Sequence, residues 1–257
     1  MKHVICMIAG LLMFLLVVEA DDTRGEKLLY DRALTEYQNN NFEESLELFQ
    51  KLIASGYSSY KLYYNTGNAA FKTGDIPEAI LNYEKALLIK PFNEDARYNL
   101  EIAKTYTVDK LEAIPEVFFI RWFKLFSLLL HTNTWSIISM ACFAFSLILL
   151  AVFLFSARYK LKKQTFLLAV VLFVISLLSF ALALTNKSLI LNNNEAIVFE
   201  PVVTGTSSPG TGGNELFVIH EGTKVEVEDK LGEWYEIRLS DGTVGWIPMD
   251  FVRKIIP

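Results

Sequence analysis

Two uncharged apolar stretches constrain the fold of this chain more than any other feature. Trp135–Phe155 and Thr165–Thr185 each hold about 20 residues, the length of helix that crosses the hydrocarbon core of a bilayer. The loop between them, residues 156–164, carries four cations and no acid. Because basic residues concentrate on the cytoplasmic side of membrane proteins, we predict a two-helix transmembrane hairpin, residues 135–155 and 165–185, with a cytoplasmic loop.

The N-terminus predicts export of the residues that follow it. A positively charged start precedes the apolar stretch Val4–Val18, which ends at the small-residue step Val18-Glu19-Ala20. This pattern is typical of a secretory signal peptide over residues 1–20, with an uncleaved anchor helix as the alternative. Either version places residue 21 outside the cytoplasm, in agreement with a cytoplasmic loop between the spans. We therefore expect two spans, with both soluble domains on the extracytoplasmic side.

The net charge of −5 over 257 residues conceals three segments of opposite sign. Residues 21–117 and 190–257 each carry −6, whereas residues 118–189 carry +7 and contain no acid. Nucleic-acid binding needs a basic surface that neither acidic segment offers, so we expect no nucleic-acid partner. The two apolar spans contain no ionisable side chain, which argues against a transporter or a channel.

Cysteine and histidine are too sparse to build a metal site. Cys6 and Cys142 lie in different apolar stretches, and the three histidines are far apart in the sequence. We therefore expect no structural disulfide, no metal and no cofactor. The sequence also contains no nucleophile–base set and no phosphate-binding loop, so we expect no catalytic residue and no enzymatic activity.

An aromatic segment precedes the first span. Pro115–Leu130 interleaves five aromatic residues with Arg121 and Lys124, which predicts a helix lying at the membrane interface over residues 115–131. Serines within the spans can hydrogen-bond one helix to the other. They are Ser136, Ser139, Ser146, Ser176 and Ser179.

Residues 34 positions apart resemble each other in the N-terminal segment. Small residues recur at Ala33 and Gly67, and large aromatic residues recur at Phe49 and Tyr83. This period and this pattern resemble tetratricopeptide repeats, which are pairs of antiparallel helices. We predict a repeat domain over residues 21–114. It contains repeats at about 26–59 and 60–93 and a capping helix at 95–110, where Glu101 occupies the packing position of Ala33 and Gly67.

The first helix of each repeat lines a groove in such arrays. The register predicts tyrosine and asparagine columns there, whose side chains can bury and hydrogen-bond an extended peptide. Asp31 and Asp95 stand where cations would be needed to grip a C-terminal carboxylate, which argues against that mode. The alternative is a solvated wall without a fixed ligand. The predicted peptide-binding residues are Tyr30, Tyr64, Asn65, Asn68, Tyr98 and Asn99.

From about residue 194 the apolar pattern changes to period two. Lys224–Glu228 alternates polar and apolar residues, and Asp241-Gly242 is a hairpin turn signal. These features predict a small all-β domain over residues 194–257. The segments Glu233-Trp-Tyr-Glu-Ile and Gly245-Trp-Ile-Pro resemble bacterial SH3-like domains.

The resemblance to SH3-like domains implies a second groove. In peptide-binding relatives, a tryptophan, a proline and a following aromatic residue line it, and the matching residues here are Trp234, Pro248 and Phe251. The acidic and aromatic opening motif of those relatives is missing, since Glu195–Pro201 contains Phe199 as its sole aromatic residue. The alternative is that these aromatic residues close the barrel.

The order of the segments resembles the E-type proteins of the aerotolerance (Bat) operon family. The residues that carry the resemblance are Asp95-Ala-Arg-Tyr-Asn-Leu-Glu, Asn133-Thr-Trp and Gly245-Trp-Ile-Pro. It implies a bacterial inner (cytoplasmic) membrane protein with its soluble domains in the periplasm. It also implies partnership with von Willebrand-type membrane proteins of the same operon, in a complex linked to aerotolerance and oxidative stress.

The predicted fold class is a multidomain membrane protein. It combines all-α tetratricopeptide helical hairpins, a two-helix transmembrane hairpin and a small all-β SH3-like barrel. The predicted function is a scaffold that presents two exported protein-interaction modules from the inner membrane. The alternative is a peptidoglycan-binding adaptor that recruits a wall-acting enzyme through the repeats.

Overall fold

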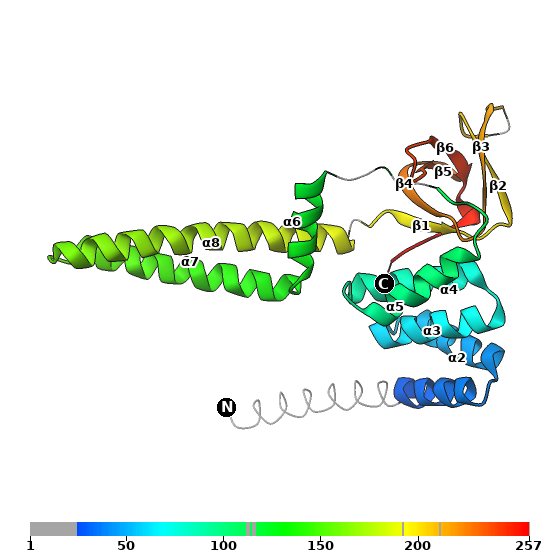
Figure 1. Ribbon diagram of the computed structural model, residues 1–257, viewed down its shortest axis with the longest axis horizontal. Coiled ribbons are helices and arrows are strands. Elements are labelled where there is room, and N and C mark those ends of the chain that lie inside the picture. Colours follow the sequence, from blue (N-terminus) through cyan, green and yellow to red (C-terminus); the bar gives the residue numbers. More distant parts are fainter. Residues whose placement is uncertain (1–24, 112–113, 115–116, 192, 211, 257) are drawn as a thin grey trace, which may run out of the picture. The chain divides into compact units, whose positions relative to one another are not determined.

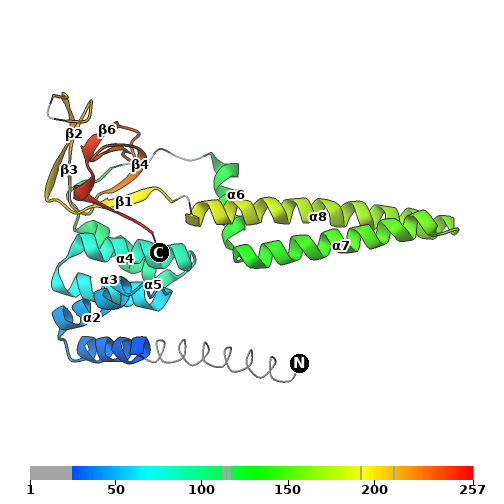
Figure 2. The same ribbon diagram turned by 180° about the vertical axis from the view of Figure 1, so that it is seen from behind.

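The chain forms two compact units (Figures 1 and 2). The computed structural model describes residues 25–111, 114, 117–191, 193–210 and 212–256. The predicted signal peptide, residues 1–20, lies outside the described residues. One unit joins the helices before residue 114 to the strands after residue 193, and the other comprises Ile114–Asn193.

Antiparallel helices form the N-terminal part of the first unit (Figure 1). Ser59, Asp75 and Asn93 each cap a helix by accepting a hydrogen bond from the backbone N–H three residues later, at 3.2, 3.1 and 2.8 Å. Gly74, at φ +83°, ends its helix in the left-handed conformation. The helices span residues 25–38, α2 Phe42–Ala54, α3 Tyr60–Thr73, α4 Ile76–Ile89 and α5 Glu94–Thr105.

The 34-residue spacing corresponds to equivalent packing in successive helix pairs. Gly67 lies so close to the ring of Tyr83 that a Cβ atom at position 67 would come within 2.7 Å of it. One repeat earlier, Ala33 and Phe49 hold the equivalent positions and are fully buried in one core cluster. A small residue on one helix thus admits a large ring from the next at the same place in both repeats. The predicted tetratricopeptide-like helical region is confirmed.

Antiparallel strands form the C-terminal part of the first unit. Their order in the sheet is β3-β2-β6-β5-β4-β1-β7. The predicted alternation holds in β4, where Val225 and Val227 are buried and Glu226 is exposed. The small all-β fold predicted for this segment is confirmed. The strands are β1 Glu195–Val198, β2 Val202–Thr206, β3 Glu215–His220, β4 Lys224–Leu231, β5 Trp234–Arg238, β6 Val244–Pro248 and β7 Val252–Lys254, with a short 3-10 helix η1 Met249–Phe251.

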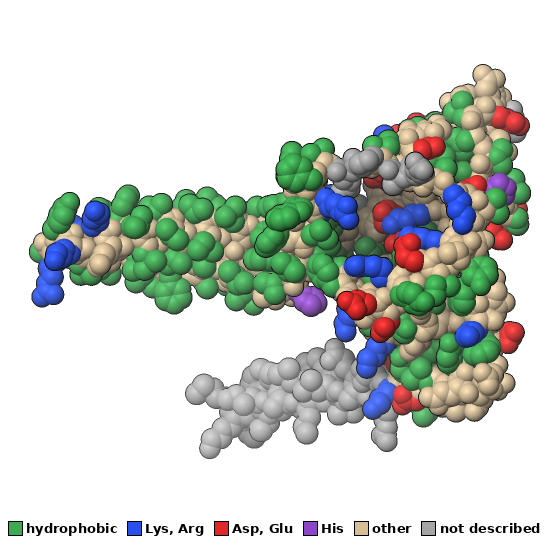
Figure 3. All heavy atoms as spheres, viewed as in Figure 1, with side chains coloured by type: hydrophobic (Ala, Val, Ile, Leu, Met, Phe, Trp, Pro, Cys, Tyr) green, Lys and Arg blue, Asp and Glu red, His purple; other side chains and the backbone are tan. Residues whose placement is uncertain are grey.

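Long apolar helices dominate the second unit, and Figure 3 shows hydrophobic side chains covering them. Ser139 and Ser176 each donate a hydrogen bond to the other's carbonyl oxygen, both at 2.9 Å. Ser146 donates to the carbonyl oxygen of Ala169, also at 2.9 Å. The predicted pair of apolar helices is confirmed, and each is long and apolar enough to cross a membrane. The helices are α6 Phe118–Leu128, α7 Thr132–Phe155 and α8 Tyr159–Leu191.

Helix α8 begins before the apolar stretch that the sequence marks. The sequence predicts a loop over residues 156–164, whereas α8 already starts at Tyr159. Lys160, Lys162 and Lys163 therefore lie in its first two turns. Lysine is a good helix former, and backbone hydrogen bonding continues where the side chains change from apolar to polar. The hydropathy pattern marks the apolar segment and not the helix end.

Candidate functional site

A cavity of about 310 Å³ lies among the repeat helices. Most of its wall comes from first helices of the helix pairs, as expected for a groove of this architecture. Residues 25–38 contribute Tyr37, and α4 contributes Tyr83. The complete lining is Tyr37, Tyr64, Asn68, Phe71, Lys72, Tyr83, Asn99 and Ile102.

Tyrosine and asparagine side chains form a repeating hydrogen-bond pattern beside and within this cavity. The Asn65 amide donates to the Tyr30 hydroxyl at 2.7 Å, and one repeat later the Asn99 amide donates to the Tyr64 hydroxyl at 3.3 Å. Asn68 Oδ1 also accepts from Asn99, at 2.9 Å. Each bond joins two neighbouring first helices. The asparagine columns therefore fix the helices as well as facing the groove.

Tyr83 gives the cavity a buried polar floor. Its hydroxyl donates to Asn68 Oδ1 at 2.8 Å, and its side chain is 1% exposed. Burial raises the pKa of Tyr83 well above its ordinary value, and burial likewise raises the pKa of Tyr37. Both phenols stay protonated at any physiological pH, so they act as neutral donors. Asn68 uses its Oδ1 in these bonds, which leaves its NH₂ group to donate to a ligand.

The structure gathers some of the predicted groove residues and separates others. Tyr64, Asn68 and Asn99 line the cavity. Tyr30 and Asn65 bond to each other outside it. Tyr98 is 68% exposed and is not part of the lining. The three retained residues are thus the core of the candidate site in the repeat helices.

The sequence pattern does not predict the aromatic floor of the cavity or one cation in its wall. Tyr83 recurs with Phe49 as a large residue of the repeat, yet it also lines the cavity together with Tyr37 and Phe71. Lys72 directly follows Phe71 and adds a positive charge to the wall. The position of Lys72 directly after Phe71 was the signal in the sequence that could have revealed this cation. Lys72 supplies the positive charge that Asp31 and Asp95 do not provide.

In the sheet, two of the three predicted groove residues come together. Trp234 on β5 lies directly opposite Pro248 on β6, so both side chains are on the same face. Phe251, on η1, packs against the core of the sheet, and its carbonyl oxygen accepts a hydrogen bond from Phe199 N–H at 2.8 Å. Phe251 therefore contributes to closing the barrel.

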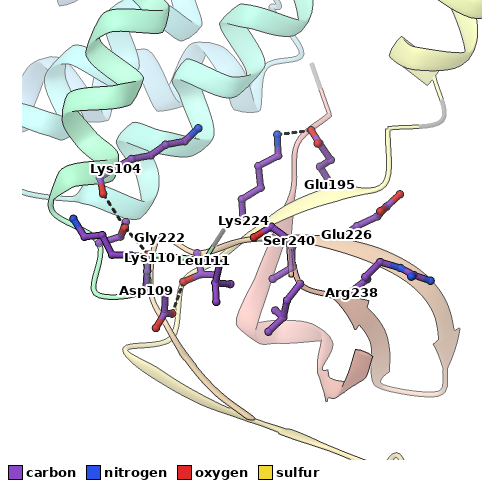
Figure 4. Close-up of a pocket in the computed structure, with 14 residues that line it drawn as sticks. Lys104, Asp109, Lys110, Leu111, Glu195, Gly222, Lys224, Glu226, Arg238 and Ser240 are labelled. Carbon is purple, nitrogen blue, oxygen red and sulfur yellow. Dashed lines mark hydrogen bonds and ion pairs between the residues drawn. The ribbon is translucent and has the colours of Figure 1, made fainter. Parts of the chain in front are cut away.

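A polar contact joins the repeat helices to the sheet; we call this junction the seam (Figure 4). Asp109, just after α5, accepts hydrogen bonds from the backbone N–H of His220 and the hydroxyl of Thr223, both at 2.6 Å. His220 Nδ1 also lies 3.0 Å from the other carboxylate oxygen of Asp109. Burial alone would raise the pKa of Asp109, but the hydrogen bonds from Thr223 and His220 outweigh it and hold that pKa below its ordinary value.

A half-buried ion-pair cluster continues the seam. Glu84 of α4 lies 3.2 Å from Lys224 of β4 and 3.4 Å from Lys104 of α5, and Lys224 also pairs with Glu195 at 2.7 Å. Burial alone would raise the pKa of Glu84, but the two lysines lower it below its ordinary value. Burial alone would lower the pKa of Lys224, but Glu84 and Glu195 raise it. Each charge is thus held in its ionised form by its partners.

Apolar contacts complete the seam. Ile197 of β1 and Ile255 are fully buried in the same cluster as Ile80 of α4 and Leu100 of α5. The helices and the sheet therefore share one hydrophobic core, which explains why they form one compact unit.

Comparisons with known families match both parts of this unit. The family model described as Tetratricopeptide repeat matches residues 30–96, and the one described as Bacterial SH3 domain matches residues 207–253. No match was found among curated proteins. Both matched domain types are typically non-catalytic interaction modules. The SH3 match begins after β1 and β2, although β1 supplies the contact with the tetratricopeptide helices.

The cleft at the seam, of about 680 Å³, presents several charges that are already paired (Figure 4). Lys224 bonds to Glu195, and Arg238 makes a two-pronged contact with Glu228. Within the described part of the chain, no group of three His, Cys, Asp or Glu residues could hold a metal ion. The chemistry of this cleft is therefore that of a structural junction between the tetratricopeptide helices and the SH3-like sheet.

Replacing Glu84 with glutamine should weaken the seam. The variant leaves Lys104 and Lys224 without their shared carboxylate, and losing a hydrogen bond to a charged group typically costs about 1.5–3 kcal/mol. We expect urea unfolding of the full chain in mild detergent to show that the free energy of unfolding falls by an amount at the lower end of that range. The matched control is Glu44→Gln, which breaks the exposed 2.7 Å pair with Arg32 and should change stability by less than about 1 kcal/mol.

Glu84→Gln and the wild type should also differ in how their stability depends on pH. Asp109 and Glu84 have pKa values lowered by folding, so their contribution is present above the unfolded values of about 3.9 and 4.3 and is lost as the pH falls further. The folded pKa of Lys224 is raised, so its contribution is lost above about pH 10.4. Stability of Glu84→Gln should fall less steeply in acid than that of the wild type. Equal slopes in the two proteins would contradict this account of the seam.

Proposed function

We propose that this protein is a membrane-anchored scaffold that holds protein partners at the bacterial envelope. The observation that carries the proposal is the cavity around Tyr64, Asn68 and Asn99 in a tetratricopeptide region that shares a core with a bacterial SH3-like sheet. The apolar helices α7 and α8 supply the anchor. Both soluble parts belong to domain types that bind other molecules without transforming them.

The cavity has the chemistry to take an extended peptide segment. Tyr37, Phe71 and Ile102 offer apolar walls for a side chain, and the NH₂ group of Asn68 can donate to a backbone carbonyl. Lys72 adds a cation that favours a segment with an acidic side chain or a terminal carboxylate. The partner is therefore proposed to present an exposed strand or tail with at least one negative charge.

The seam changes how the two modules would cooperate. Modules on a flexible linker gain affinity through effective concentration, which depends on linker length. Here the shared core of Ile80, Leu100, Ile197 and Ile255 removes that freedom. A partner that touches both the helices and the sheet therefore meets a preorganised surface and loses less conformational entropy on binding.

The identity of the partners is proposed from the order of the segments. The order of tetratricopeptide repeats, membrane hairpin and SH3-like domain along the chain resembles that of the E-type proteins of the aerotolerance operon family. We propose accordingly that von Willebrand-type membrane proteins are the partners, in an envelope complex linked to oxidative stress tolerance. Support for this part comes from the resemblance alone.

A pull-down tests the scaffold proposal and its groove. Affinity-tagged full-length protein, extracted from membranes in mild detergent, should recover von Willebrand-type proteins. The double variant Asn68→Ala/Asn99→Ala removes the ligand donor of Asn68, about 1 kcal/mol, and the internal bonds of Asn99 to Tyr64 and Asn68. Recovery should therefore fall at least roughly 5-fold, while urea unfolding shows that the variant is still folded. Asn39→Ala, at an exposed position, is the matched control and should behave as wild type. Undiminished recovery by the double variant would remove the groove from the proposal.

Reporter fusions test the topology. The basic loop at one end of α7 and α8 is proposed to be cytoplasmic, with both soluble parts on the other side of the membrane. A reporter at Lys162 should show cytoplasmic behaviour, and reporters at Lys90 and Lys230 should show exported behaviour. The reverse pattern would mean that both modules are inside the cell.

A peptidoglycan-binding adaptor is the second candidate, favoured by the match to a bacterial SH3 domain. Trp234 and Pro248 on one face of the sheet would form its contact surface. Full-length protein in mild detergent should then sediment with purified wall material, and Trp234→Ala should lose that retention. Val218→Ala, at an exposed residue of β3, is the control. Retention that survives Trp234→Ala would rule out this surface, and no retention of wild type would rule out the adaptor.

A further inference from the structure

An aromatic pocket of about 560 Å³ lies in the second unit, between α6 and the long helices. Its volume falls in the range of roughly 300–1,000 Å³ that is usual for small-molecule sites. Trp122 on α6 and Trp135 on α7 face it, and Ser179 is its one residue with a polar side-chain atom other than the two indole N–H groups. The full lining is Phe118, Phe119, Trp122, Phe123, Phe126, Trp135, Ile175, Leu178, Ser179 and Leu182.

The pocket is preformed because a polar clasp holds α6 against α8. The side chain of Asn186 on α8, 3% exposed, donates to the carbonyl oxygens of Ser127 at 2.8 Å and Leu130 at 3.3 Å. The Thr132 hydroxyl donates to Asn186 Oδ1. Trp135 Nε1 donates to the Ser127 carbonyl at 2.9 Å, which also satisfies the indole. These bonds fix the C-terminal end of α6. The pocket lies between the aromatic residues of α6 and helix α8.

Helix α6 is amphipathic in a way that matches a membrane surface. Phe118, Trp122 and Phe126 follow the helical repeat along the face that lines the pocket, whereas Arg121 and Lys124 fall outside the lining. The aromatic rings remain 75%, 65% and 51% exposed. Such large exposed aromatic side chains are stable next to hydrocarbon, with cations of the same helix at the level of the lipid headgroups.

We infer that this pocket binds an acyl chain of a bilayer phospholipid. The inference rests on the membrane anchoring by α7 and α8 in the proposed function. The pocket lies at the start of α7 and the C-terminal half of α8, away from the basic loop, so the lipid belongs to the leaflet opposite that loop. A hydrocarbon chain fills an apolar space without leaving polar groups unsatisfied. A peptide segment would bury backbone groups that this lining does not satisfy.

Native mass spectrometry tests the site on the full chain. Wild type released from mild detergent should carry bound phospholipid. Ser179→Phe fills the pocket and should lose that lipid, and Trp122→Ala removes part of its wall without touching a buried core and should retain less. The matched controls are Leu177→Phe on α8 and Phe145→Ala on α7, both exposed positions outside the lining, and they should retain lipid as wild type does.

Fluorescence quenching gives an independent readout in a bilayer. A variant that keeps Trp122 and Trp135, the two tryptophans that face the pocket, carries Trp234→Phe and Trp246→Phe. In nanodiscs whose phospholipids carry bromine on the acyl chains, the emission of these two tryptophans should be quenched, and adding Ser179→Phe should reduce the quenching. Lipids brominated on the headgroup alone should quench less than chain-brominated lipids.

Four results would overturn the inference. Wild type that is folded and free of lipid would do so. Lipid retention equal to wild type in both Ser179→Phe and Trp122→Ala would do so too, as would tryptophan quenching that Ser179→Phe leaves unchanged. A dimer that only the two pocket variants lose would mean that a second copy of the chain covers the pocket. Release of wild type from membranes by alkaline carbonate would instead show that the proposed anchoring is wrong, which separates the two failures.

Discussion

An array of stacked helices ends in an apolar face that another element must cover, and this chain covers it with a sheet. Helix α5 begins a further helix pair, yet the chain continues from it to Asp109 and not into a second helix of that pair. Ile197 and Ile255 of the sheet fill the space against Ile80 and Leu100 instead. Arrays of this type need terminal caps for solubility. The joining of helices and sheet into one compact unit therefore depends on this contact.

The ionic part of the seam gives this hydrophobic contact a defined register. Isolated charges in such a place would be costly, since burial disfavours the ionised forms of Glu84 and Lys224. Each keeps its charge because oppositely charged partners lie within 3.4 Å. Apolar side chains alone tolerate small shifts, whereas the pairs among Glu84, Lys104, Lys224 and Glu195 fix which residues of helix and strand meet.

Sequence patterns predicted the parts of the fold that rest on local periodicity. The spacing of Gly67 and Tyr83 from Ala33 and Phe49 located the helix pairs, and alternation around Val225 located a strand. Long-range polar contacts left no such pattern: nothing in the sequence links Asp109 to Thr223, which is 114 positions away. Of the groove, the sequence identified Tyr64, Asn68 and Asn99 but not Lys72 or the floor at Tyr83. It could not tell that a packing ring also faces a cavity.

The seam also decides where mechanical load would enter the soluble unit. Asp109 and Glu195 line the same cleft, one just before the chain departs for the apolar helices and the other just after it returns. Tension along either connection is thus applied at neighbouring points that hydrogen bonds and ion pairs already tie together. A pull along these connections would load this joint, so the helices and the sheet of the first unit would move together.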